Sequence, residues 1–176
     1  MNFILAQVMG GIALVLVALS YFTKEKKKFF IIQIIANIFY GASFIFNMAL
    51  VGGINFLICT IRIVVFFLYE RKKRAVPIYV VALFCCAFIV VGGIFFKDYY
   101  DLITIAAPIL FTIAMCMKDM QMVRYLMILP NVAVTIYSII NQVYTSALLD
   151  FLEVLVIVVS IIVYHIDKKR QIRYLL

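Results

Sequence analysis

The chain has 176 residues, of which 68% are hydrophobic and only 14% are charged. Its mean hydropathy of +1.18 is far above that of soluble domains, so the composition excludes a soluble fold and indicates an integral membrane protein. The net charge of +8 does not predict nucleic-acid binding, because the basic residues lie in short connections between apolar runs. The four cysteines lie inside apolar runs without metal-ligand spacing, so no metal site is expected.

Seven apolar runs follow one another, each close to the length that crosses a bilayer. They cover residues 3–22, 29–48, 53–69, 77–96, 102–117, 125–140 and 148–165. The fifth and sixth runs are short, so their helices are expected to extend into the regions of Tyr99 and Met120. The first run has its positive cluster after it, which predicts a retained span rather than a signal peptide. We therefore predict an all-α membrane protein with seven transmembrane helices.

The basic residues predict an orientation for these spans. Of the 16 lysines and arginines, 14 follow spans one, three, five and seven; Lys97 follows span four and Arg62 lies inside span three. Positive loops stay on the cytoplasmic side, and adjacent loops must alternate between sides. The pattern predicts an N-terminus outside and a cytoplasmic C-terminus.

A shift of 94 residues partly superposes the chain on itself. The shift places Lys24 on Lys118, Asn37 on Asn131 and Asn47 on Asn141, and a small adjustment places 72–74 on 168–170. Two three-helix repeats, residues 1–74 and 99–176, would then be joined by a linker helix in residues 75–98. An odd linker gives both repeats the same orientation, so the predicted architecture is 3+1+3 with parallel three-helix bundles.

Polar residues inside the spans are the candidate site. Gln33, Asn37, Tyr40 and Asn47 fall within about 80° of one another around the helix axis, so they share one helix face. An unpaired amide facing lipid costs several kcal/mol, so these side chains should face inward. The predicted substrate-binding residues are Gln33, Asn37, Tyr40, Asn47, Asn131, Ser138 and Asn141. Alternatively, the amides only join helices to one another, and Asn47 and Asn141 cap or solvate the ends of their spans.

Arg62 lies in the middle of span three and needs an acceptor. The expected partner is Glu153 in span seven, with Asp150 one turn away on nearly the same face. The three residues either form a structural ion pair or control access to the pathway. Pro108 and Pro130 each remove a backbone hydrogen bond within a span and are candidate hinges, or kinks tolerated by packing.

The opening LAQVMGGIALVLVALSYF, the KEKKKFF after it, the polar second span and the ICTIR of the third resemble the YgjV-like bacterial inner-membrane proteins. These are similar to the SWEET, PQ-loop and PnuC-type transporters. The resemblance implies a bacterial inner-membrane location and passage of a small polar solute, sugar-like or nucleoside-like, between two helix blocks. The chain contains no tryptophan, which sugar carriers typically use beside the substrate, so the resemblance does not extend to a sugar specificity.

The sequence thus favours a facilitative transporter of a small polar metabolite. A membrane-embedded binding or scaffold protein is the alternative, in which the polar faces only hold helices together. No nucleophile and base, phosphate loop or ligand cluster is present in the sequence, so we expect neither an enzyme nor a cofactor. The expected partners are membrane lipids and the solute, and the sequence leaves open whether the chain forms a homo-oligomer.

Overall fold

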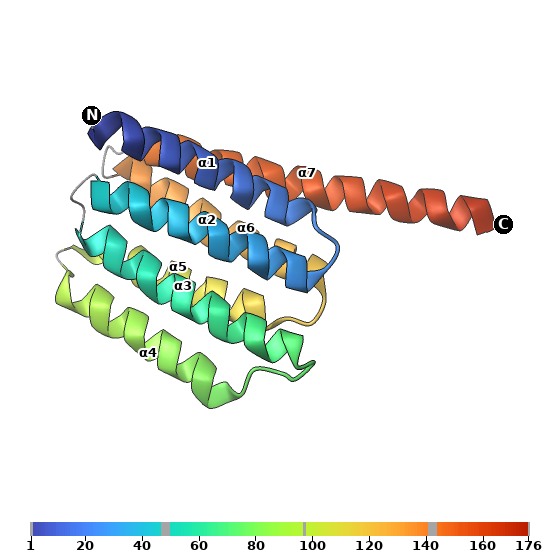
Figure 1. Cartoon of the computed structure of the whole chain (residues 1–176), viewed down its shortest axis with the longest axis horizontal. Helices are drawn as coiled ribbons and strands as arrows, with labels where there is room; N and C mark the ends of the chain where they lie inside the picture. Colours follow the sequence, from blue (N-terminus) through green and yellow to red (C-terminus); the bar gives the residue numbers. More distant parts are fainter. Residues whose placement is uncertain (1, 47–49, 97, 141–143, 176) are drawn as a thin grey trace.

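The computed structural model describes residues 2–46, 50–96, 98–140 and 144–175 (Figure 1), and the side chains of residues 4–43, 54–96, 98–140 and 147–167. Over these residues it contains seven α-helices and one short 3-10 helix, and no strand. The helices are α1 (Asn2–Phe22), α2 (Lys26–Phe46), α3 (Leu50–Arg71), α4 (Ile78–Ile94), α5 (Leu102–Cys116), α6 (Met120–Ile140) and α7 (Tyr144–Leu175), with η1 (Tyr99–Asp101) before α5. The predicted all-α fold with seven helices is confirmed.

The helix bounds follow the apolar runs except at one end. As expected, the fifth and sixth helical regions extend to Tyr99 and Met120. However, the last apolar run ends at His165, whereas α7 continues to Leu175 and is 32 residues long. The added stretch contains Lys, Arg and Gln, which favour helices, and no Gly or Pro. The end of an apolar run marks where a bilayer ends, not where a helix does.

The helices form two layers that lie face to face (Figure 1). One layer contains α1, α2 and α3 in that order, and the other contains α7, α6 and α5. The layers meet where α1 packs against α7, and α4 joins α3 to α5 at the other edge. The division into repeats of residues 1–74 and 99–176 stays a prediction.

The two ends of the bundle differ in charge. The connections after α1, α3 and α5 lie at one end, which we call the basic end, and α7 extends beyond it. The connections after α2, α4 and α6 lie at the other end, which we call the opposite end.

The surface of the bundle is apolar. Leucine, isoleucine and valine side chains are exposed on all seven helices, whereas aromatic side chains such as Phe29, Phe30, Phe66 and Phe88 fill the interior. Among the described residues, four helical segments are long and apolar enough to cross a membrane: Ile4–Phe22, Tyr99–Cys116, Met120–Ile140 and Ala147–Asp167. The apolar helix α4 is shorter, and the described parts of α2 and α3 each carry three charged residues. This surface suits contact with lipid tails.

Candidate functional site: a polar seam between helix blocks

Polar side chains gather where α1 and α2 face α6 and α7. We call this interface the seam. Its polar members are Ser20 and Tyr21 of α1, Gln33, Asn37 and Tyr40 of α2, Asn131 and Ser138 of α6, and Asp150 and Glu153 of α7. Ser20, Tyr21, Gln33, Asn37, Asn131 and Ser138 are buried, as the prediction of inward-facing polar groups requires.

The centre of the seam joins helices that are far apart in the chain. The Tyr40 hydroxyl donates a hydrogen bond to Glu153 Oε1 at 3.3 Å. The Tyr21 hydroxyl lies 3.5 Å from Met127 Sδ of α6, and it is close enough to Asn131 and Glu153 to interact with both. A side chain from each of α1, α2, α6 and α7 therefore meets at one place.

Asn37 is the seam residue whose hydrogen bonds are not used. On the same face of α2, the Gln33 amide donates to Ser20 Oγ at 2.9 Å, and Tyr40 reaches Glu153. Asn37 lies between these two residues and is only 8% exposed. Within the described part of the chain, its amide makes no hydrogen bond. The Asn37 amide is thus without a described protein partner, although its polar atoms are not among the fully buried unpaired ones, which belong to Arg62, Gln121 and Arg124.

The other predicted amides differ in their surroundings. Asn131 donates to the Met127 carbonyl of its own helix at 2.9 Å, and Ser138 donates to Asp150 Oδ2 at 3.2 Å. The side chains of Asn47 and Asn141 lie outside the described residues. The structure therefore brings Gln33, Asn37, Tyr40, Asn131, Ser138, Asp150 and Glu153 to one interface.

The expected pairing of Arg62 with Glu153 is wrong. Arg62 is 3% exposed, and its Nη1 donates to the Pro108 carbonyl at 3.0 Å and to Thr112 Oγ1 at 2.8 Å. Its guanidinium also lies 5.4 Å from the centre of the Phe88 ring. The reason is the helix order: α3 packs against α2 and α4, so Arg62 turns toward α4 and α5, while Glu153 faces Tyr40. A backbone carbonyl and a hydroxyl serve a buried guanidinium in place of a carboxylate.

Both prolines lie inside helices, Pro108 in α5 and Pro130 in α6. The Pro108 carbonyl accepts hydrogen bonds from Arg62 and from Thr112 Oγ1. This carbonyl therefore has a side-chain partner from α3 as well as one from its own helix. The proposed hinge role of the two prolines stays a prediction.

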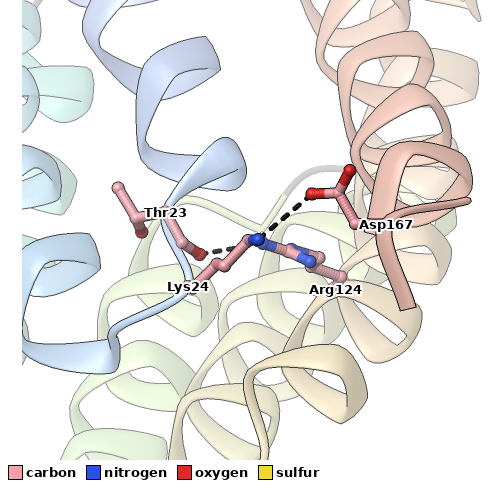
Figure 2. Close-up of polar contacts among 4 residues, drawn as sticks. All are labelled: Thr23, Lys24, Arg124 and Asp167. Atoms are coloured by element: carbon pink, nitrogen blue, oxygen red, sulfur yellow. Dashed lines mark hydrogen bonds and ion pairs between the residues drawn. The ribbon is translucent and has the colours of Figure 1, made fainter. Parts of the chain in front are cut away.

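At the basic end, three contacts tie residues just after α1 to the second layer. Arg124 Nη2 of α6 donates to the Thr23 carbonyl at 2.8 Å, and Lys24 pairs with Asp167 of α7 at 3.1 Å (Figure 2). Lys26 donates to the Met117 carbonyl at the end of α5. These contacts tie the two layers together at the basic end, beside a cavity of about 20 Å³ that Lys24, Arg124 and Asp167 help to line.

Arg124 is 2% exposed, although the apolar runs of the sequence did not indicate it as an interior residue. Its position one residue before the sixth apolar run makes it look like a loop residue. Helix periodicity does indicate its burial. Arg124 precedes Met127 by three residues and Asn131 by seven, which puts all three side chains on one helix face. Its Nε and Nη1 have no hydrogen-bond partner in the described structure, and its guanidinium lies 5.9 Å from the Tyr164 ring centre.

A cavity of about 130 Å³ lies at the opposite end of the bundle. It is lined by residues of both layers and of α4, among them Asn55, Phe88, Asp101, Thr104 and Tyr137. Tyr137 donates to Asp101 Oδ1 at 2.9 Å on its wall. The bundle is therefore hollowed at one end and tied at the other.

Apolar helices of membrane length around a buried polar seam define a multi-pass α-helical membrane protein. The sequence matches the family Imp-YgjV, described as bacterial inner membrane protein, over residues 4–169. The chain belongs to this family, and it is an inner membrane protein. No curated protein and no solved structure matches it.

Proposed function

We propose that the chain is a facilitative transporter of a small polar metabolite, which crosses the bilayer along the seam by alternating access. The observation that carries this proposal is Asn37, a buried amide without a hydrogen bond in the described part of the chain. An amide offers both a donor and an acceptor to a solute, and no described side chain uses those of Asn37.

The two ends of the bundle support alternating access. The contacts of Thr23, Lys24 and Lys26 tie the layers together at the basic end, whereas the opposite end carries a cavity that lies beside the seam and not in it. A tie at one end and a hollow at the other suit a bundle that opens on one side of the membrane at a time. The resemblance to SWEET, PQ-loop and PnuC-type transporters supports the same mechanism, with transport rather than enzymatic chemistry as the activity.

We also propose that the N-terminus lies outside and the basic end faces the cytoplasm, because positive residues stay on the cytoplasmic side. Single cysteines at Asp98 and at Lys73 test this in spheroplasts, since the two positions lie at different ends of the bundle. A membrane-impermeant maleimide should label the Asp98→Cys variant and not the Lys73→Cys variant. The reverse pattern contradicts the orientation.

The transport proposal is tested with proteoliposomes loaded with a mixture of small polar metabolites, whose efflux is followed by mass spectrometry. Asn37→Leu removes the free amide with little change in volume, and we expect it to abolish efflux of the transported compound. Thr60→Val is the matched control, because Thr60 bonds only to the Phe56 carbonyl of its own helix among the described contacts.

Both variants should elute and unfold like the unchanged protein. Loss of folded protein in Asn37→Leu, with no efflux above empty liposomes for the unchanged protein, supports a scaffold and contradicts transport. The homo-oligomeric state can be measured in the same samples by light scattering.

A further inference from the structure

The seam contains two carboxylates and no described cation. Asp150 and Glu153 are three residues apart on α7, so they lie one turn apart on the same side of the helix. Asp150 accepts from Ser138 of α6, and Glu153 accepts from Tyr40 of α2. Both carboxyl groups are therefore bonded to neighbouring helices, and both residues are half-buried.

None of the described ion pairs or arginine contacts involves Asp150 or Glu153. The ion pairs among described residues join Lys24 to Asp167, Lys26 to Glu70 and Lys28 to Glu25. The two buried arginines also bond away from these carboxylates: Arg62 contacts α5, and Arg124 contacts Thr23 at the basic end. A charge removed from water without a counter-charge is costly, so a carboxyl group served only by hydroxyls either stays protonated or gains a cation.

The free amide of Asn37 is a second and independent sign of a ligand here. Asn37 lies three residues before Tyr40 on one face of α2, and the Tyr40 hydroxyl reaches Glu153. The groups around the centre of the seam are thus two carboxylates, two tyrosine hydroxyls, a serine hydroxyl and an unused amide oxygen. The carboxylates and the amide oxygen can accept hydrogen bonds from an ammonium group.

We propose that Asp150 and Glu153 bind the positive charge of the solute, so that the solute is a small organic cation with a primary ammonium group. Asn37 would bind a polar group of the same molecule one turn along α2. Charge-assisted hydrogen bonds from the ammonium group to the carboxylates would supply the orientation. The inference rests on the proposed function in that it assigns the charge of the transported solute.

Four-carbon compounds of equal length test the charge preference directly. Binding of 1,4-diaminobutane, 4-amino-1-butanol, 1,4-butanediol and succinate is measured by titration calorimetry on the full chain in nanodiscs. We expect saturable binding of the two amines, and neither the diol nor succinate should bind at the same concentration. Equal or tighter binding of the diol or succinate overturns the proposal, and so does the absence of amine binding.

Charge-neutralising variants then locate the site. Glu153→Gln and Asp150→Asn should each weaken amine binding by at least about tenfold, which is about 1.4 kcal/mol. Glu25→Gln is the control, because Glu25 is exposed and pairs with Lys28 outside the seam, and its amine affinity should be unchanged. If Glu153→Gln fails to fold, Glu153→Asp keeps the charge and should retain amine binding. Equal affinities in Glu153→Gln, Asp150→Asn and the unchanged protein overturn the assignment.

The same compounds separate this inference from the transport proposal. Amines that bind without crossing the bilayer of proteoliposomes contradict transport and support the cation site. Efflux of neutral metabolites without any binding of amines supports transport and overturns the cation site.

Discussion

The Tyr40 hydroxyl donates a hydrogen bond to the Glu153 carboxylate at 3.3 Å, joining α2 to α7 across the seam. An O–H to carboxylate bond is usually 2.5–2.7 Å long, so this contact is loose. The residues are 113 positions apart, and the bond connects the two layers of the bundle. A weak bond between layers is one that a solute can replace at low cost.

Replacing Tyr40 by Phe should therefore strengthen amine binding. The change removes a hydroxyl that competes for Glu153, while the ring keeps its stacking on Phe56 at 5.2 Å. The free energy of unfolding should fall by at most about 1 kcal/mol, the value of one hydrogen bond. Calorimetry with 1,4-diaminobutane and thermal unfolding measure both effects.

Tyr137→Phe is the control for this change, because it removes a tyrosine hydroxyl from a carboxylate, that of Asp101, on the wall of the cavity at the opposite end. We expect its amine affinity to be unchanged. Weaker amine binding in Tyr40→Phe would contradict the prediction and would show that the Tyr40 hydroxyl itself contacts the solute.

Arg62 and Glu153 should be energetically independent. Arg62 bonds to Pro108 and Thr112, and no described contact joins it to Glu153. In a double-mutant cycle of Arg62→Met and Glu153→Gln, the coupling energy should be within about 0.5 kcal/mol of zero. A cycle of Arg62→Met with Thr112→Val should give a larger coupling, because the two side chains are in contact. A coupling of several kcal/mol in the first cycle would restore the ion pair.

The inward face of α2 could be predicted because helix register is a local property of the sequence. Residues 33, 37 and 40 repeat at helical spacing, and the cost of an amide in lipid fixes the direction in which they point. Gln33 and Asn37 are accordingly buried. Asn131 could be placed in the same way.

Contacts between helices could not be predicted by the same argument. Glu153 was expected to pair with Arg62 because the two residues have opposite charges and lie at similar depths in their spans. Which helix faces meet, however, depends on the order of the helices around the bundle. That order places α4 and α5 beside Arg62. Arg124 was missed for a related reason, since the apolar run begins after it while the helix begins four residues before it. The sequence therefore indicates which helix faces are polar, but it does not indicate which faces contact each other.

Two adjacent glycines of α4 should respond differently to substitution. A Cβ on Gly92 would collide with the Ile105 side chain of α5, whereas a Cβ on Gly93 would have no neighbour within 4 Å. Gly92→Ala should lower the unfolding temperature, because α4 must move away from α5, at a cost of about 1–3 kcal/mol. Gly93→Ala should leave it unchanged or raise it slightly, since Ala favours a helix over Gly. Equal unfolding temperatures for the two variants would show that α4 and α5 are not closely packed at Gly92.

The tie at the basic end should loosen when Arg124 is replaced by Met. Arg124 is buried without a described carboxylate partner, so a hydrophobic side chain of similar size should cost little stability. The hydrogen bond to the Thr23 carbonyl is lost, however, and residues 23–26 should exchange their amide hydrogens faster. Hydrogen exchange measured by mass spectrometry detects this in a protein whose unfolding temperature is nearly unchanged.

Lys28→Ala is the control at the same end, because Lys28 pairs only with nearby Glu25 among the described ion pairs and both side chains are 64% exposed. Lys24→Ala should have a smaller effect than Arg124→Met, since an exposed ion pair contributes at most about 1 kcal/mol. A lower unfolding temperature in Arg124→Met with unchanged exchange at 23–26 would mean that Arg124 only fills the interior and does not hold the basic end closed.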